Sequence, residues 1–185
     1  MLRQLPGGVA VLLGHSLGAL LARELLRRGR VTPRAAVLIS PPAAGRPAGD
    51  SALARAGALT DHRFEPDDPS QARADFVAHV LAETRGEPAP ELLHVARFVD
   101  ASAPWEHRAL VAHLRRLLAR PVRPFEPACP VLVLVGEEDR TTPPRQAREV
   151  AEATAGATLV VISGAGHYPF GERPRETARA VLEAL

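Results

Sequence analysis

The strongest constraint on the fold is an alternation of strand-like and helix-like patterns at both ends of the chain. Short apolar runs rich in β-branched residues are typical of strands buried on both faces of a sheet. Four such runs cover residues 9–13, 35–40, 131–136 and 158–163. Helical periodicity follows the first, third and fourth runs, and Gly29 and Gly156 stand where helix C-terminal caps belong. The spacing predicts an α/β fold: a parallel sheet of about four strands with flanking helices.

The middle of the chain has a different pattern. Between residues 48 and 120 the periodicity is helical, and Phe76, Val77, Val80 and Leu81 fall on one face of a predicted helix. We therefore expect three parts. Residues 1–47 and 121–185 form the two halves of the α/β core, and residues 48–120 form a helical lid inserted between them.

Composition excludes several classes of protein. The formal net charge is only +2, and the arginines alternate with acidic residues without a basic run that carries aromatics. We therefore expect no nucleic-acid partner. No apolar stretch approaches the ~20 residues that span a bilayer, and the first run is shorter than the ~7–15 residues of a signal-peptide core. With a single cysteine, a disulfide framework is excluded. The sequence predicts a cytoplasmic protein with no membrane partner.

A candidate nucleophile lies directly after the first strand. Residues 14–18 read GHSLG, a G-x-S-x-G motif between a predicted strand and a predicted helix. This is the context of a nucleophile elbow, in which a strained turn exposes the serine hydroxyl. We expect side chains at Gly14 or Gly18 to collide with neighbouring backbone, and the N–H of Leu17 to face an oxyanion. The simpler alternative is that Ser16 only caps the helix.

A serine hydroxyl needs a positioned base, which in turn needs an orienting acid. The loop after the third predicted strand carries Glu137, Glu138 and Asp139, and the loop after the fourth carries His167. The carboxyl ends of parallel strands meet at one edge of a sheet. The sequence therefore predicts that Ser16, His167 and one of the three acidic residues converge there.

Three segments, GHSLGA, VLVLVGEEDRTTPP and SGAGHYPFGERP, resemble the serine-nucleophile branch of the α/β-hydrolase superfamily. The resemblance implies Ser16 as nucleophile, Asp139 as acid and His167 as base. The family's acid usually stands three residues after the glycine that ends its strand, which selects Asp139. The implied reaction is hydrolysis of an ester, lactone or thioester of a small acyl substrate. Carbon–carbon bond hydrolysis is a further family chemistry. This chemistry needs only water and the three side chains, so no cofactor or metal is implied.

Other residues are candidates for substrate contact. His15 lies inside the elbow, Tyr168 and Phe170 follow the candidate base, and Trp105 begins a helix of the predicted lid. Each has a plainer interpretation as a packing residue.

The sequence departs from the family pattern at its start. Only fifteen residues precede Ser16, and no His-Gly pair, the usual source of a second oxyanion donor, occurs in the chain. Three hypotheses follow. In the first, the chain is part of a longer hydrolase, and this sequence lacks the N-terminal part of the fold. In the second, it is a minimal hydrolase that pairs its exposed strand edge with a second copy. It could also be an inactive remnant that serves as an interaction module.

Overall fold

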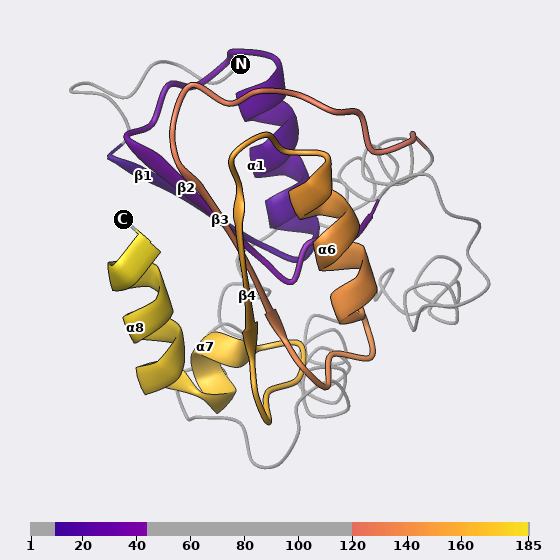
Figure 1. The fold of residues 1–185 in the computed structure, drawn as a ribbon, viewed down its shortest axis with the longest axis vertical. Helices are drawn as coiled ribbons and strands as arrows, with labels where there is room; N and C mark the ends of the chain where they lie inside the picture. The colour runs from indigo at the N-terminus through magenta and orange to yellow at the C-terminus, as the bar shows by residue number, and fades with distance from the viewer. Residues whose placement is uncertain (1–9, 44–119, 185) are drawn as a thin grey trace, which may run out of the picture.

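The computed structural model describes residues 10–43 and 120–184, which form a four-stranded parallel sheet. The strands lie side by side in the order β1-β2-β3-β4, as in the chain (Figure 1). The bounds are β1 Val11–His15, β2 Ala35–Ile39, β3 Val131–Gly136 and β4 Thr158–Ile162. The helices are α1 Leu17–Arg27, α6 Pro144–Glu152, α7 Pro169–Glu172 and α8 Pro174–Ala184. The expected parallel sheet of about four strands with flanking helices is confirmed.

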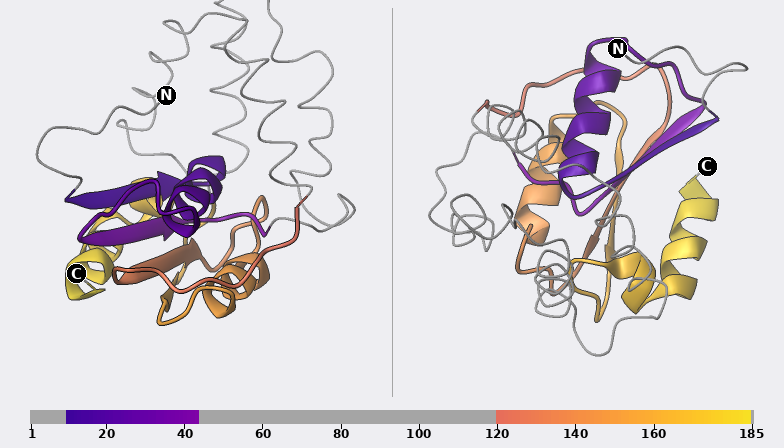
Figure 2. Two further views of the ribbon diagram at one scale, coloured as in Figure 1. Left: turned by 90° about the horizontal axis from the view of Figure 1, so that it is seen from above. Right: turned by 180° about the vertical axis from the view of Figure 1, so that it is seen from behind.

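The sheet is covered on both faces, because the apolar side chains of its central strands alternate between two cores. On one face Leu38 and Val133 pack with Ala22 of α1 and Val150 of α6. On the other face Val37 and Leu134 pack with Ala180 of α8. Figures 1 and 2 show α1 and α6 on one side of the strands and α8 on the other. Because the four strands are parallel, their carboxyl ends lie at one edge of this three-layer arrangement.

The first strand differs from its prediction in position and burial. It was expected at residues 9–13 and buried on both faces, whereas β1 covers Val11–His15 and pairs only with β2 among the described strands. Val11 and Leu13 are 41% and 59% exposed. The edge position agrees with the exposed strand edge expected from the sequence. The expected burial on both faces is wrong, because only one face of β1 packs against a core, through Leu12. Pairing of this edge with a second copy stays a prediction.

Other local signals predicted the structure closely. The third strand has the predicted bounds, and all five residues of β2 are buried. Gly29 ends α1 with a φ of +60°, and the Arg30 N–H donates to the Leu25 carbonyl at 2.9 Å. A positive φ at this position is typical of a glycine that ends a helix.

A buried arginine joins α1 to the segment that enters β3. The Arg23 guanidinium donates to the carbonyl oxygens of Arg123 and Ala153 at 2.6 and 3.1 Å, and to the Thr154 hydroxyl at 3.3 Å. It also lies 5.0 Å from the ring centre of Phe125. Burial lowers the pKa of Arg23. These contacts fix the two halves of the core to each other independently of the sheet.

The predicted lid, residues 48–120, lies almost wholly outside the described residues, as does Trp105. Among the helices of the described ranges, none combines the length and apolar character that a membrane span requires.

Candidate active site

The elbow lies where β1 meets α1. Ser16 has φ 53° and ψ −121°, a backbone conformation that residues with a side chain rarely adopt. Its side chain makes no capping hydrogen bond to α1. The interpretation of Ser16 as a simple helix cap is therefore wrong, and its hydroxyl is held by a strained turn after β1.

The two glycines of the motif play different roles. A Cβ on Gly14 would lie 2.7 Å from the carbonyl carbon of Gly18 and would overlap its oxygen. At Gly18 a Cβ would meet no atom of the described residues within 4 Å. The expected collision therefore holds at position 14 and is wrong at position 18. The backbone of Gly18 lies against Gly14. Of the two glycines, only Gly14 must therefore lack a side chain.

The start of α1 offers backbone donors beside the serine. The Ser16 N–H donates to the Ile39 carbonyl at 2.8 Å, which fastens the elbow to β2. The Ser16 carbonyl accepts from the N–H groups of Ala19 and Leu20. Leu17 is the first helical residue, and its N–H has no acceptor among the described residues. Such an N–H at a helix start can stabilise a developing negative charge.

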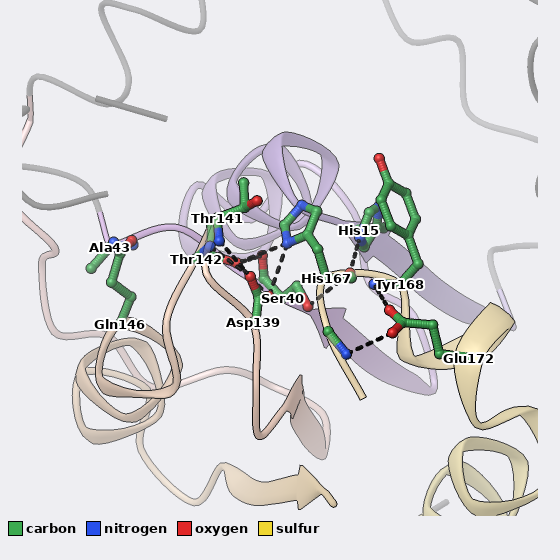
Figure 3. Close-up of polar contacts among 11 residues, drawn as sticks. His15, Ser40, Ala43, Asp139, Thr141, Thr142, Gln146, His167, Tyr168 and Glu172 are labelled. Atoms are coloured by element: carbon green, nitrogen blue, oxygen red, sulfur yellow. Dashed lines mark hydrogen bonds and ion pairs between the residues drawn. The ribbon is translucent and has the colours of Figure 1, made fainter. Parts of the chain in front are cut away.

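The structure brings Asp139 and His167 together. The Nδ1 of His167 lies 2.9 Å from Oδ2 of Asp139 and donates to it, and both side chains are buried (Figure 3). With its proton held by the carboxylate at Nδ1, the imidazole can accept a proton only at Nε2. Among the described residues, no hydrogen bond joins the Ser16 hydroxyl to this ring. Contacts of this kind often tighten only when substrate binds.

The conformation of the loop after β3 distinguishes the three acidic candidates for the partner of His167. Glu137 is exposed, and its Oε2 accepts a hydrogen bond of 2.7 Å from the Ser163 hydroxyl. Asp139 is 3% exposed and accepts the N–H groups of Thr141 and Thr142 at 2.9 and 2.8 Å. These two bonds turn the Asp139 carboxylate towards the imidazole. Of the three, Asp139 is the one that bonds His167.

The backbone around His167 is held on both sides. Its carbonyl accepts from Nε2 of His15 at 2.8 Å and from the Ser40 hydroxyl at 3.2 Å. The Glu172 carboxylate accepts the N–H groups of Gly166 and Tyr168, the residues before and after the histidine, at 2.9 and 3.0 Å (Figure 3). The position of the ring therefore depends on contacts from β1, from the residue that follows β2 and from α7.

Aromatic rings lie beside the imidazole of His167. The ring of His15 lies 4.8 Å from that of His167, 4.9 Å from Tyr168 and 5.1 Å from Phe170, measured between centroids. His15, Tyr168 and Phe170, which were expected near the substrate, thus form one cluster beside the imidazole. Their contact with a substrate stays a prediction.

Sequence reasoning missed three residues of this site: Ser40, Thr142 and Glu172. Ser40 follows β2 at the same sheet edge as the other site residues, so its position was a usable signal. Thr142 and Glu172 carried none, because their roles depend on contacts with loops that only the folded sheet brings close.

Compared with known protein families, residues 1–180 match the alpha/beta hydrolase family. The chain belongs to this family. The family assignment agrees with the sheet, the elbow and the edge at which Asp139 and His167 meet.

Solved alpha/beta hydrolases resemble the chain over most of its length. A thermophilic esterase from Thermogutta terrifontis is 27% identical with a TM-score of 0.64, and the match covers 95% of this chain and 64% of the esterase. The crystal structure of BpoC from Mycobacterium tuberculosis, which bears the name of a non-heme bromoperoxidase, is 25% identical with a TM-score of 0.60. That match covers 96% of this chain and 66% of BpoC. In sequence, BpoC is 43% identical over 56 residues, 30% of this chain and 21% of BpoC. The chain thus spans slightly less than two thirds of these hydrolases.

Proposed function

We propose that this chain hydrolyses acyl compounds through a covalent acyl-serine intermediate, with Ser16 as nucleophile, His167 as base and Asp139 as acid. The observation that carries the proposal is the 2.9 Å hydrogen bond between His167 and Asp139. It lies at the sheet edge where the strained Ser16 also follows its strand. Membership of the alpha/beta hydrolase family and the likeness to an esterase support the same chemistry.

The proposed reaction has two halves. In the first, the Ser16 oxygen attacks the carbonyl carbon while Nε2 of His167 takes the hydroxyl proton. The Asp139 carboxylate stabilises the resulting imidazolium through its bond to Nδ1. The tetrahedral oxyanion accepts the N–H of Leu17, and the bond to the leaving alcohol or thiol breaks as Nε2 returns the proton to it. Water then attacks the acyl-serine by the same relay and releases the acid.

The substrate class follows from the mechanism. Attack by serine requires an acyl carbonyl with a leaving group, so esters, lactones and thioesters are the candidates. The cluster of His15, Tyr168 and Phe170 beside the imidazole favours an acyl group with an apolar or aromatic part. No step calls for a metal or an organic cofactor.

The proposal is tested with a fluorophosphonate probe, which reacts covalently only with an activated serine. We expect wild type to be labelled at Ser16 and Ser16→Ala to be unlabelled. We also expect wild type to release p-nitrophenol from short p-nitrophenyl esters, with acyl-CoA thioesters assayed in parallel. Absence of labelling in folded wild type, or equal labelling of Ser16→Ala, would contradict the proposal.

A further inference from the structure

A second serine in the described part of the chain has a strained backbone. Apart from glycines, the only residues there with a positive φ are Ser16, at 53°, and Ser40, at 48°. They follow the adjacent parallel strands β1 and β2. Ser40 is fully buried and takes no part in the reaction proposed above. A glycine would adopt this φ without strain, but it could not supply the hydroxyl.

Ser40 uses three of its polar groups to join the two loops of the site. Its N–H donates to the Leu134 carbonyl of β3 at 2.7 Å. Its hydroxyl donates to the His167 carbonyl at 3.2 Å, and its own carbonyl oxygen lies 3.0 Å from the Thr142 hydroxyl, within hydrogen-bonding distance. One residue therefore contacts both the loop that carries the base and the loop that carries the acid.

Thr142 continues this connection to the reacting groups. Its hydroxyl oxygen lies 2.9 Å from Oδ2 of Asp139 and 3.2 Å from Nδ1 of His167, and its side chain is buried (Figure 3). A hydroxyl has a single proton, so it donates either to the Ser40 carbonyl or to the Asp139 carboxylate. In the first arrangement its lone pairs face the Nδ1–H of the imidazole, and in the second it shares the carboxylate oxygen with that N–H. In both arrangements the Thr142 hydroxyl contacts the two atoms that join the acid to the base, Oδ2 of Asp139 and Nδ1 of His167.

We propose that Ser40 and Thr142 are positioning residues that fix the orientation of the His167 imidazole relative to Asp139. Ser40 holds the backbone of His167, and Thr142 holds the acid and the ring nitrogen that faces it. Because His167 and Thr142 both bind Ser40, movement of the loop that carries one is transmitted to the loop that carries the other. This inference rests on the proposed function, in which the two groups are base and acid.

The test compares two substitutions at Thr142. Thr142→Val keeps the shape of the side chain and removes the hydroxyl, whereas Thr142→Ser keeps the hydroxyl. Loss of a buried hydrogen bond to a charged group should lower kcat for p-nitrophenyl acetate about 10- to 100-fold. We expect KM to stay within twofold, because the side chains of Ser40 and Thr142 are buried. Thr142→Ser should retain most of the rate.

The matched control is Thr177→Val in α8. Thr177 is also buried, and its hydroxyl has no hydrogen-bond partner among the described residues. This variant should keep the wild-type kcat. An equal loss of kcat in Thr177→Val and Thr142→Val would overturn the inference, since the effect would then belong to any buried threonine.

Two substitutions at Ser40 test its contact with the His167 backbone. Ser40→Ala and Ser40→Gly both lose the bond to the His167 carbonyl, while only Ser40→Gly also relieves the strain. We expect both to lower kcat by a similar factor, with Ser40→Gly the more stable. If Thr142→Val fails to fold, Ser40→Ala and Ser40→Gly still test whether this connection positions His167. Wild-type kcat in both Ser40 variants would refute the inference.

A readout without turnover separates this inference from the proposed function. Proton NMR of the substrate-free protein detects the imidazole N–H of His167 that is bonded to Asp139. We expect its resonance to move or broaden in Thr142→Val and Ser40→Ala, and to be preserved in Thr142→Ser and Thr177→Val. An unchanged resonance together with a kcat within twofold of wild type would exclude a positioning role. If wild type is neither labelled nor active, the proposed function fails, whatever the resonance shows.

Discussion

Gly136 lies so close to the backbone of Gly166 that a Cβ on Gly136 would overlap the Gly166 carbonyl oxygen. Gly136 ends β3 and begins the loop that carries Asp139, and Gly166 precedes His167. The Ala165 carbonyl lies against the same position. The two loops that hold the candidate acid and base therefore touch directly, and the contact requires a glycine.

Gly136→Ala should displace the His167 loop from the Asp139 loop. The colliding atoms belong to the backbone, so the strain cannot be relieved by rotating a side chain. We expect the free energy of unfolding to fall by about 1–3 kcal/mol, measured by urea denaturation. The kcat should fall further than this loss of folded protein explains. A variant with wild-type kcat would show that the loops tolerate separation.

The motif glycines give a second, paired prediction. Gly14→Ala should be strongly destabilising, because its Cβ would collide with the backbone of Gly18. Gly18→Ala should fold normally and gain roughly 0.5–1 kcal/mol, since alanine is the better helix former and no described atom lies in its way. Thermal unfolding of both variants beside wild type checks the pair. Equal melting temperatures for the two variants would contradict the structure.

The third prediction concerns Glu172, which binds the amides on both sides of His167. Glu172→Gln leaves one acceptor oxygen for two N–H groups and places an amide N–H near one of them. We expect about 1–2 kcal/mol of lost stability and a lower kcat. Amide hydrogen exchange should accelerate at Gly166 and Tyr168. Glu183→Gln, a substitution at an exposed position of α8, is the control and should change none of these three quantities. Unchanged exchange at both amides would rule out this role for Glu172.

The fourth prediction is a pH dependence of stability at Glu24. Hydrogen bonding from Arg27, with a further bond from Arg28, lowers the pKa of Glu24 from 4.5 to about 2, although burial opposes the shift. The carboxylate bonds Arg27 at 2.7 and 2.9 Å. A carboxyl whose pKa is lowered by folding stabilises the protein above its unfolded pKa, and this contribution disappears as pH falls through the folded pKa.

Wild type should therefore exceed Glu24→Gln in stability at neutral pH, by up to about 1 kcal/mol for a half-buried pair at the surface. The difference should shrink as the pH falls below 4.5 and disappear near pH 2. Urea denaturation at several pH values measures it, with Glu183→Gln as the control. A difference that stays constant from pH 7 to pH 2 would contradict the assigned cause.

The sequence alone determined the elements whose signals are local. Residues 131–136 were predicted and observed as the same strand, because a continuous β-branched run is a local pattern. The cap at Gly29 and the elbow at Ser16 also followed from local signals: Gly29 adopts a positive φ, and Gly14 leaves room for the backbone of Gly18. The sheet edge shared by Ser16, Asp139 and His167 followed from the order of strands and helices.

Only the tertiary structure decided which groups meet. It placed the Ser40 hydroxyl on the His167 carbonyl, and it brought the Thr142 hydroxyl beside Ser40, Asp139 and His167. These contacts join residues that are up to 127 positions apart. Their geometry depends on strand register and loop packing to within an ångström. Local periodicity records which residues are buried, but it carries no information about which distant polar groups will lie within hydrogen-bonding distance.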